Sequence, residues 1–169
     1  MNSNEQLIDD FYSAFQKLDW QSMRQCYAEN IHFSDPAFTD LNGDEAGAMW
    51  QMLCSRAQDF ELSFSDVQAD DTHGSARWQA SYTFSKTGRK VQNVIFAEFQ
   101  FAHGKIVRHS DHFSFWRWSR MALGPVGVAL GWSGYLKRKV QQQALTGLKI
   151  FMRRHYSKKP PKSSSESSI

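Results

Sequence analysis

Hydrophobic side chains recur at helical spacing in the first third of the chain. Residues 3–18 predict a helix, with Ser3 and Gln6 fitting a capping box, and a second, shorter helix ends near Glu29. The pattern Asn42–Glu45 is another capping box and predicts a third helix after it. The inward positions expected on the three helices are Ile8, Phe11, Tyr12, Phe15 and Leu18; Met23, Cys26 and Tyr27; and Ala46, Met49, Trp50, Leu53 and Cys54.

Alternating apolar and polar positions then predict strands. Residues 31–36 form a short strand that stops at Pro36, and three further segments begin near Phe60, Ala76 and Val91. Turn signals at 70–74 and 86–89 separate these segments, and short turns between consecutive strands predict an antiparallel meander. One face of the third segment carries Val91, Asn93, Ile95, Ala97, Phe99 and Phe101.

The segment 105–118 predicts a long final strand, because it is rich in aromatic and β-branched residues. One face of this strand would carry Val107, His109, Asp111, Phe113 and Phe115. The opposite face would carry Ile106, Arg108, Ser110, His112, Ser114 and Trp116. The first face places an acid and an imidazole among core-type side chains. A carboxylate in such a place is either paired internally, turned to solvent, or lining a pocket, and the pattern leaves these interpretations open.

The order of elements predicts an α+β fold with helices packed on one face of a cone-shaped, curved antiparallel sheet, a half-open barrel whose mouth suits a small molecule. We expect the barrel over residues 1–118, a helical extension over 119–156 and a disordered, serine-rich tail over 157–169. The extension includes a basic amphipathic helix over 135–155. Such a helix docks on its own domain, which is the ordinary case, or on a partner or an anionic membrane surface.

Composition narrows the class of protein. The 169 residues suit one domain, and the 13 Phe and 6 Trp are enough to line an apolar cavity. No apolar run is long enough for a membrane span, the first residues do not resemble a signal peptide, and Cys26 and Cys54 lack the spacing of a metal or redox motif, so we expect a cytoplasmic protein. Residues 1–136 hold 11 Lys/Arg and 16 Asp/Glu, whereas residues 137–169 hold 9 Lys/Arg and one Glu, so the basic charge belongs to the C-terminal segment.

Taken in order, these elements resemble the nuclear-transport-factor-2-like superfamily, in its SnoaL-like polyketide cyclase and ketosteroid isomerase branch, over about residues 5–118. The residues that carry the resemblance are Phe11-Tyr12-Ser13-Ala14-Phe15, Asp19, Cys26-Tyr27-Ala28-Glu29-Asn30, Phe33-Ser34-Asp35-Pro36, Gly43, Phe101-Ala102-His103-Gly104-Lys105-Ile106-Val107 and His109-Ser110-Asp111. The resemblance implies a cone-shaped, usually dimeric barrel around a hydrophobic pocket.

The resemblance also implies roles for two acids. Asp35 falls where the steroid isomerases keep their general base, and Asp111 where the SnoaL-like cyclases keep their acid/base carboxylate. The oxyanion donors of the isomerases are not matched, because Phe11 stands near the place of their Tyr and Ala97 near the place of their protonated Asp.

Two hypotheses follow. In the first, the protein is a cofactor-independent cyclase- or isomerase-like enzyme that transfers protons on an apolar, carbonyl-containing molecule, with Asp111, Asp35 and His109 as catalytic residues. In the second, it is a non-catalytic ligand- or protein-binding module whose basic helix contacts a partner or a membrane surface. A homodimer is expected, whereas a nucleic-acid partner and a metal site are not, since no reading motif is present and His112 faces away from His109 and Asp111. The ligand-binding candidates are Phe15, Trp50, Trp78, Tyr82, Phe99 and Phe113.

Overall fold

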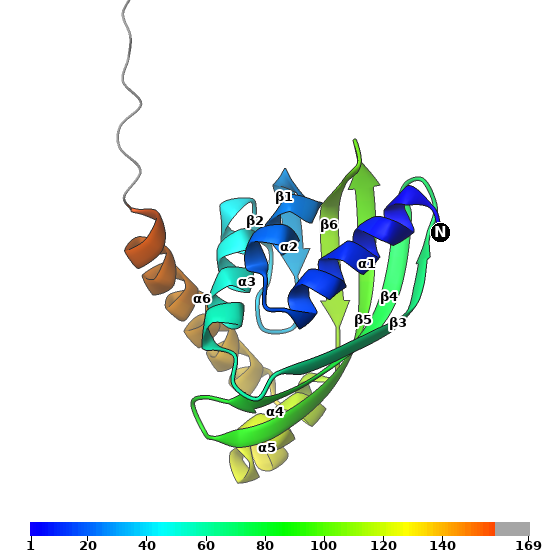
Figure 1. The fold of residues 1–169 in the computed structure, drawn as a ribbon. Coiled ribbons are helices and arrows are strands. Elements are labelled where there is room, and N and C mark those ends of the chain that lie inside the picture. Colours follow the sequence, from blue (N-terminus) through cyan, green and yellow to red (C-terminus); the bar gives the residue numbers. More distant parts are fainter. Residues whose placement is uncertain (158–169) are drawn as a thin grey trace, which may run out of the picture.

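A computed structural model describes residues 1–157 and confirms the α+β class (Figure 1). All but the first residue of the predicted tail therefore lies outside the described residues. The elements in chain order are α1 (Ser3–Gln16), α2 (Trp20–Cys26), β1 (Tyr27–Ser34), β2 (Leu41–Asn42), α3 (Asp44–Arg56), β3 (Glu61–Ala69), β4 (His73–Phe84), β5 (Arg89–Ala102), β6 (Lys105–His112), α4 (Phe115–Leu123), α5 (Pro125–Leu130) and α6 (Gly134–Tyr156).

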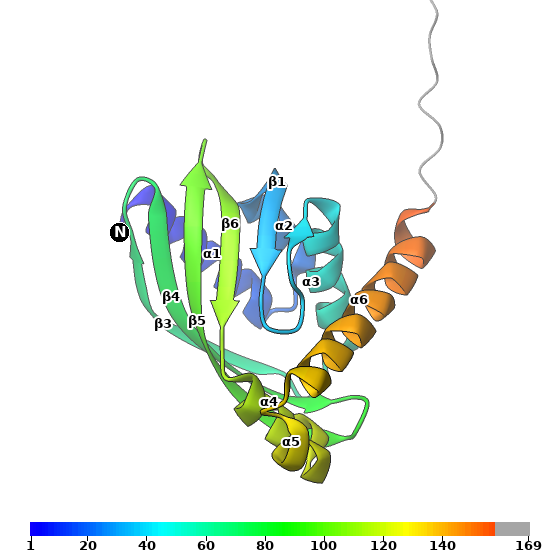
Figure 2. The same ribbon diagram turned by 180° about the vertical axis from the view of Figure 1, so that it is seen from behind.

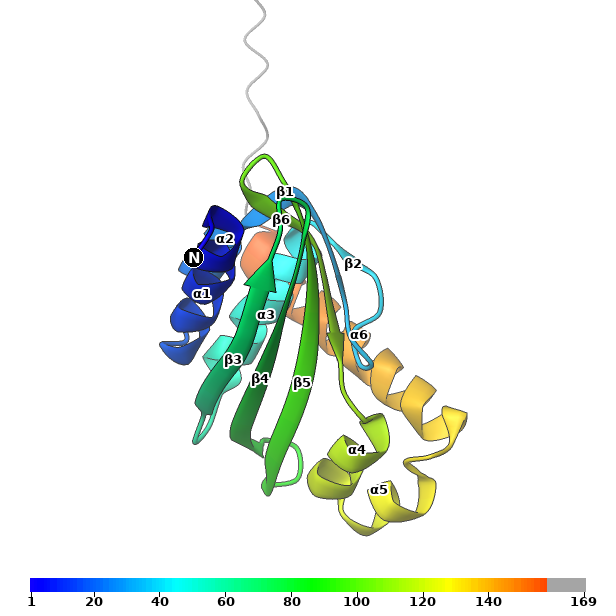
Figure 3. The ribbon, with the colours of Figure 1, turned by 90° about the vertical axis from the view of Figure 1, so that its right-hand side faces the viewer.

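The six strands form one curled sheet in the order β2-β1-β6-β5-β4-β3. Neighbouring strands run antiparallel except β1 and β6, which lie side by side in parallel. The long strands β3, β4 and β5 bend strongly, so that the sheet curls around the helices without closing, as Figure 3 shows. This curl is what leaves room for a cavity between the sheet and the helices.

Helices α1, α2 and α3 cover the concave face of the sheet, as predicted (Figure 1). The predicted inward face of β5 is confirmed, since Val91, Asn93 and each second residue to Phe101 are buried. On the helices, Leu53 is not part of the core: it is 38% exposed and lines a cavity. The hydrophobic core contains Ile8, Phe11, Tyr12, Phe15, Met23, Ile31, Phe33, Met49, Trp50, Trp78, Ile95, Phe99 and Ile106, among others.

Several helix ends differ from prediction by one to three residues; α1 ends at Gln16, and the cap of α3 is Gly43 and not Asn42. The cap of α1 is Asn2, whose side chain accepts the Glu5 N–H at 2.8 Å while the Glu5 carboxylate accepts the Asn2 N–H at 2.9 Å. Asn and Ser are comparable caps, so the sequence alone did not separate Asn2 from Ser3. Helix α2 ends at Cys26, and Tyr27 opens β1 instead of continuing the helix.

The predicted strand over 105–118 is wrong in its second half. Strand β6 ends at His112, and the Ser114 hydroxyl accepts the Arg117 N–H at 3.3 Å as the cap of α4. Phe115 therefore packs with Val91, Trp118 and Ala122 in a separate small cluster.

The predicted alternation also fails at the start of β6. Gln100 pairs with Arg108 but Phe101 pairs with Ile106, so the strand carries an extra residue at Val107. A bulge of this kind shifts the side-chain alternation by one residue. Ile106 consequently shares the buried face with His109 and Asp111, although simple alternation placed it on the opposite face.

The C-terminal helices return to the barrel. Helices α4 and α5 lie beneath the bent ends of β4 and β5, and α6 runs from there along α3 (Figure 2). Leu136, Leu148 and Phe151 of α6 are buried, and its Gln141 side chain donates to the Pro36 carbonyl at 3.0 Å. The expectation that this helix docks on its own domain is confirmed. Within residues 1–157, no helix is both long and apolar enough to cross a bilayer.

Candidate active site

A cavity of about 330 Å³ lies between the concave face of the sheet, α3 and the C-terminal helices. Five of the six predicted ligand-binding residues line it: Phe15, Trp50, Trp78, Tyr82 and Phe113. The sixth, Phe99, does not line it, because its ring is buried behind the wall, with its centroid 4.5 Å from that of His109. Most of the lining is aromatic or aliphatic, as expected of a small-molecule site.

The parallel pairing of β1 and β6 brings the two predicted acids together. Ser34 is the register partner of Ser110, so Asp35 and Asp111 each follow one residue later at the same level of the sheet. Adjacent strands lie about 4.8 Å apart. Both carboxyl groups line the cavity, and they are close enough that the charge of Asp111 acts on Asp35.

Asp35 is held by the turn that follows β1. Its Oδ1 atom accepts the N–H groups of Ala37 at 2.7 Å and Phe38 at 2.6 Å. The pKa of Asp35 is raised to about 7, chiefly because the carboxyl group is removed from water, with a further contribution from the charge of Asp111, and the two backbone N–H groups offset part of this rise. A carboxyl group with this pKa can release or accept a proton near neutral pH.

Two ring N–H groups hold one oxygen of the Asp111 carboxylate in place. Its Oδ1 atom lies 2.9 Å from His109 Nε2 and accepts the Trp78 indole N–H at 3.3 Å. Asp111 Oδ2 makes no hydrogen bond with any residue from 1 to 157. One oxygen of this carboxylate is therefore fixed by the protein, and the other is available to a ligand.

The hydrogen bonds continue behind Asp111 and determine which nitrogen of His109 carries hydrogen. The Tyr27 hydroxyl accepts the Trp50 indole N–H at 2.9 Å and lies 2.6 Å from His109 Nδ1. Burial raises the pKa of Tyr27 well above its usual value, so the phenol keeps its hydrogen and donates it to Nδ1. A neutral imidazole then carries its hydrogen on Nε2 and donates it to Asp111. His109 is fully buried and does not line the cavity, so it acts through Asp111.

The cavity wall also holds two hydrogen-bond donors, Tyr82 and Asn93. The sequence predicts Tyr82 only as a ligand-binding residue and assigns no role to Asn93. The Tyr82 hydroxyl accepts the Trp118 indole N–H at 3.0 Å, which leaves its own hydrogen free to point elsewhere. Asn93 is buried, lines the cavity and makes no side-chain hydrogen bond within residues 1–157. Asn93 was visible in the sequence as the one polar residue on an otherwise apolar face of its strand. Trp118 falls in the predicted strand over 105–118, but in the structure it lies on α4.

The C-terminal helices close the cavity and were not predicted to do so. Trp118 and Leu123 of α4 line it, together with Val140, Gln143, Ala144 and Gly147 of α6. Elsewhere, Cys26 and Cys54 are buried and free. Within the described chain, no three His, Cys, Asp or Glu side chains gather closely enough to hold a metal ion.

Comparisons with known proteins identify the fold and the family. The family model of the SnoaL-like domain matches residues 8–109. A candidate polyketide cyclase from Pseudomonas putida KT2440 is 17% identical, with a TM-score of 0.60 over 72% of this chain and 98% of that one. A hypothetical protein with a ketosteroid isomerase-like fold from Catenulispora acidiphila DSM 44928 is 9% identical, with a TM-score of 0.61 over 70% of this chain and 93% of that one.

An LEH-like epoxide hydrolase from M. tuberculosis is 15% identical, with a TM-score of 0.57 over 88% of this chain and 96% of that one. At these identities the solved structures establish the fold alone. No curated protein sequence matches the chain. The family model covers more than half of the sequence, and on that ground the chain belongs to the SnoaL-like domain family of the nuclear-transport-factor-2-like superfamily.

Proposed function

We propose that the protein binds a small apolar, carbonyl-containing molecule in this cavity and moves a proton on it without a cofactor. The observation that carries the proposal is the presence of two carboxyl groups, Asp35 and Asp111, in one apolar cavity but in unlike surroundings. Environments that separate the proton affinities of two acids allow one to act as base while the other acts as acid.

Asp111 is the proposed base. Donation from His109 and Trp78 holds Oδ1 in place, so Oδ2 is left to take a proton from the carbon next to the ligand carbonyl. A positioned general base typically contributes about 10²- to 10⁴-fold to the rate. His109 is a positioning residue in this scheme, since it does not line the cavity and its Nε2 atom meets the Asp111 carboxylate.

Asp35 is the proposed second acid/base group. With a pKa of about 7 it is partly protonated at neutral pH, so it can return a proton to the ligand after Asp111 has removed one. The protonated Asp111 then passes its proton to the ionised Asp35, directly or through water, which restores both groups. The net change is an isomerisation, or a ring closure in which the new carbon–carbon bond forms at a second carbonyl.

Tyr82 and Asn93 are the proposed donors to the ligand oxygen. Removal of a proton next to a carbonyl places negative charge on its oxygen, and fixed donors that meet this charge lower the barrier. Burial raises the pKa of Tyr82, so its hydroxyl keeps its hydrogen, and the bond from Trp118 fixes the position of its oxygen.

Deuterium exchange tests the proposal. A panel of cyclic and polycyclic apolar ketones is incubated with the protein in D₂O, and incorporation next to the carbonyl is followed by mass spectrometry. Gly147 lines the cavity, and a Cβ atom added there meets no atom within 4 Å. Gly147→Trp should therefore fold, fill the cavity and reduce catalysed exchange by at least about tenfold, because the ligand is excluded.

Ile150→Trp is the matched control, because Ile150 lies on the same helix but is 40% exposed. It should leave exchange unchanged. Equal exchange in Gly147→Trp and the wild type would show that the cavity is not the site. No exchange with any ketone, despite binding of an apolar fluorescent dye that Gly147→Trp abolishes, would contradict the enzyme proposal.

The second candidate is a carrier that binds the same kind of ligand without reaction. Phe11 and Ala97 are both fully buried and apolar, at positions where the resemblance to steroid isomerases implies oxyanion donors. Without other donors a bound ketone would be held but not activated. Dye binding without exchange is the outcome that this candidate predicts.

A further inference from the structure

Helix α5 meets the rest of the protein through Gly127 and its C-cap Gly131, and its larger side chains point outwards. A Cβ atom on Gly127 would lie 1.8 Å from the Ser119 carbonyl oxygen, and one on Gly131 would lie 2.1 Å from the Ser119 hydroxyl. Only glycine lets α5 approach α4 this closely. The remaining residues of α5 are Pro, Val, Ala and Leu, and in this orientation they have no protein to pack against.

The result is an exposed apolar surface at one end of the molecule, which we name the apolar tip. A short helix that is apolar all round is normally buried, and a contiguous exposed apolar patch marks an interaction site. The end of the molecule formed by α4 and α5 projects beyond the sheet in all three ribbon views (Figures 1–3). The apolar tip consists of Val126 (52% exposed), Val128 (53%), Leu130 (43%), Trp132 (77%) and Tyr135 (64%).

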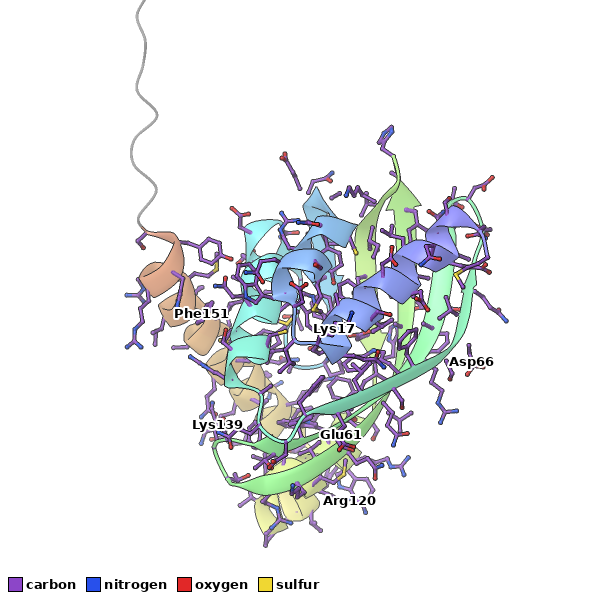
Figure 4. All side chains as sticks on the ribbon, in the orientation of Figure 1. Lys17, Glu61, Asp66, Arg120, Lys139 and Phe151 are labelled. Atoms are coloured by element: carbon purple, nitrogen blue, oxygen red, sulfur yellow. The ribbon has the colours of Figure 1, made fainter. Side chains whose placement is uncertain are left out.

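Positive charge adjoins the apolar tip. Residues 112–139, which include α4, α5 and the start of α6, contain five Lys and Arg and neither Asp nor Glu. Lys137, Arg138 and Lys139 are all exposed in the first turns of α6, directly after Tyr135. Figure 4 shows Lys139 on α6 and Arg120 on α4 near this end of the molecule. A basic segment without acidic residues, next to exposed Trp and Tyr, is typical of protein surfaces that lie in the headgroup region of anionic bilayers.

We propose that the apolar tip inserts into the surface of an anionic membrane while Lys137, Arg138 and Lys139 contact lipid phosphates. The charge argues against a second copy of the chain as the occupant, because two basic surfaces would repel each other. The tip projects outwards and offers no groove for a peptide, whereas a bilayer needs only apolar side chains that project from a basic surface. Helices α4 and α6 also wall the cavity, so binding would bring the cavity next to the lipid.

Vesicle flotation of the full chain tests the proposal independently of any catalysis. Vesicles of phosphatidylcholine alone are compared with vesicles that contain about 30 mol% phosphatidylglycerol, at low and high salt. We expect binding to the anionic vesicles only, and weaker binding in high salt. The double variant Val128→Ser/Trp132→Ser should reduce the bound fraction at least tenfold, and Lys137→Ser/Lys139→Ser should do the same.

Two control variants remove side chains of the same kinds, apolar and basic, from a different part of the surface. Val94→Ser/Phe96→Ser removes two exposed apolar side chains of β5, and Arg77→Ser/Arg108→Ser removes two exposed charges of the sheet. Both should bind as the wild type does, and circular dichroism should show all four variants folded.

Three outcomes would overturn the proposal. The wild type could fail to float with anionic vesicles at low salt. It could float equally well without the apolar tip, which would assign binding to charge elsewhere in the chain. Finally, sedimentation could show self-association that Val128→Ser/Trp132→Ser abolishes, which would make a second copy the occupant.

Discussion

Replacing Asp111 with Asn should lower the rate of catalysed deuterium exchange by about 10²- to 10⁴-fold, the usual contribution of a positioned general base. The amide keeps an oxygen that can accept the bonds from His109 and Trp78, so the fold and the binding of the ketone should persist. What is lost is the ability to take up a proton. The measurement is the exchange rate of the best ketone of the panel, together with its dissociation constant.

Asp66→Asn provides the control, because Asp66 is an exposed acid on β3 whose backbone φ of 55° is well tolerated by Asn. It should exchange the ketone at the wild-type rate. Full activity in Asp111→Asn would remove Asp111 from the mechanism. A loss of ketone binding in that variant would instead give Asp111 a role in holding the ligand.

Asp35→Asn should make the protein more stable at about pH 8, by roughly 2–4 kcal/mol, because it removes the cost of ionising a half-buried carboxyl group in an apolar cavity. The pKa of Asp35 is raised from 3.8 to about 7 in the folded state. The contribution of this group to stability is therefore fully present below about pH 4 and is lost as pH rises through about 7. Asn keeps the acceptor for the Ala37 and Phe38 N–H groups, so the turn is preserved.

Urea unfolding of the wild type and of Asp35→Asn at several pH values measures this effect. The difference in the free energy of unfolding between the two proteins should grow from pH 4 to pH 7 and stay constant above. The other acids titrate in both proteins, so the difference reports Asp35 together with its interaction with Asp111. A difference that does not change with pH would show that Asp35 ionises as an ordinary exposed acid does.

The sheet could be predicted well from the sequence where one face meets the core and the other meets solvent. Strand β5 is such a case, because each second residue from Val91 to Phe101 is buried and the pattern has no other explanation. The two acids were found for a related reason. Asp35 follows Ile31 and Phe33 on an inward face, Asp111 follows His109 on another, and the parallel register of β1 and β6 brings the two acids together.

The sequence was ambiguous where local preferences support two structures. The run from Phe113 to Trp118 is aromatic enough for a strand, but Ser114 is also a good helix cap, and packing on Val91 decides for the helix. The bulge at Val107 could not be predicted, because it depends on how β6 pairs with β5 and not on its own side chains.

The cavity walls contributed by α4 and α6 also escaped prediction. Their apolar positions indicated that the helices dock, but the surface on which they dock depends on where the curled sheet leaves an opening. Gly147 illustrates the limit. Its lack of a side chain leaves space in the cavity, yet in the sequence it reads only as a glycine within a helix.

The most direct test of the account is an NMR titration of the side-chain carboxyl carbons of Asp35 and Asp111, with signals assigned from Asp35→Asn and Asp111→Asn. The account predicts that Asp35 titrates near pH 7 and that its midpoint falls in Asp111→Asn, because the neighbouring charge is gone. A midpoint for Asp35 near pH 4 that does not move in Asp111→Asn would contradict the claim that two acids share one apolar cavity.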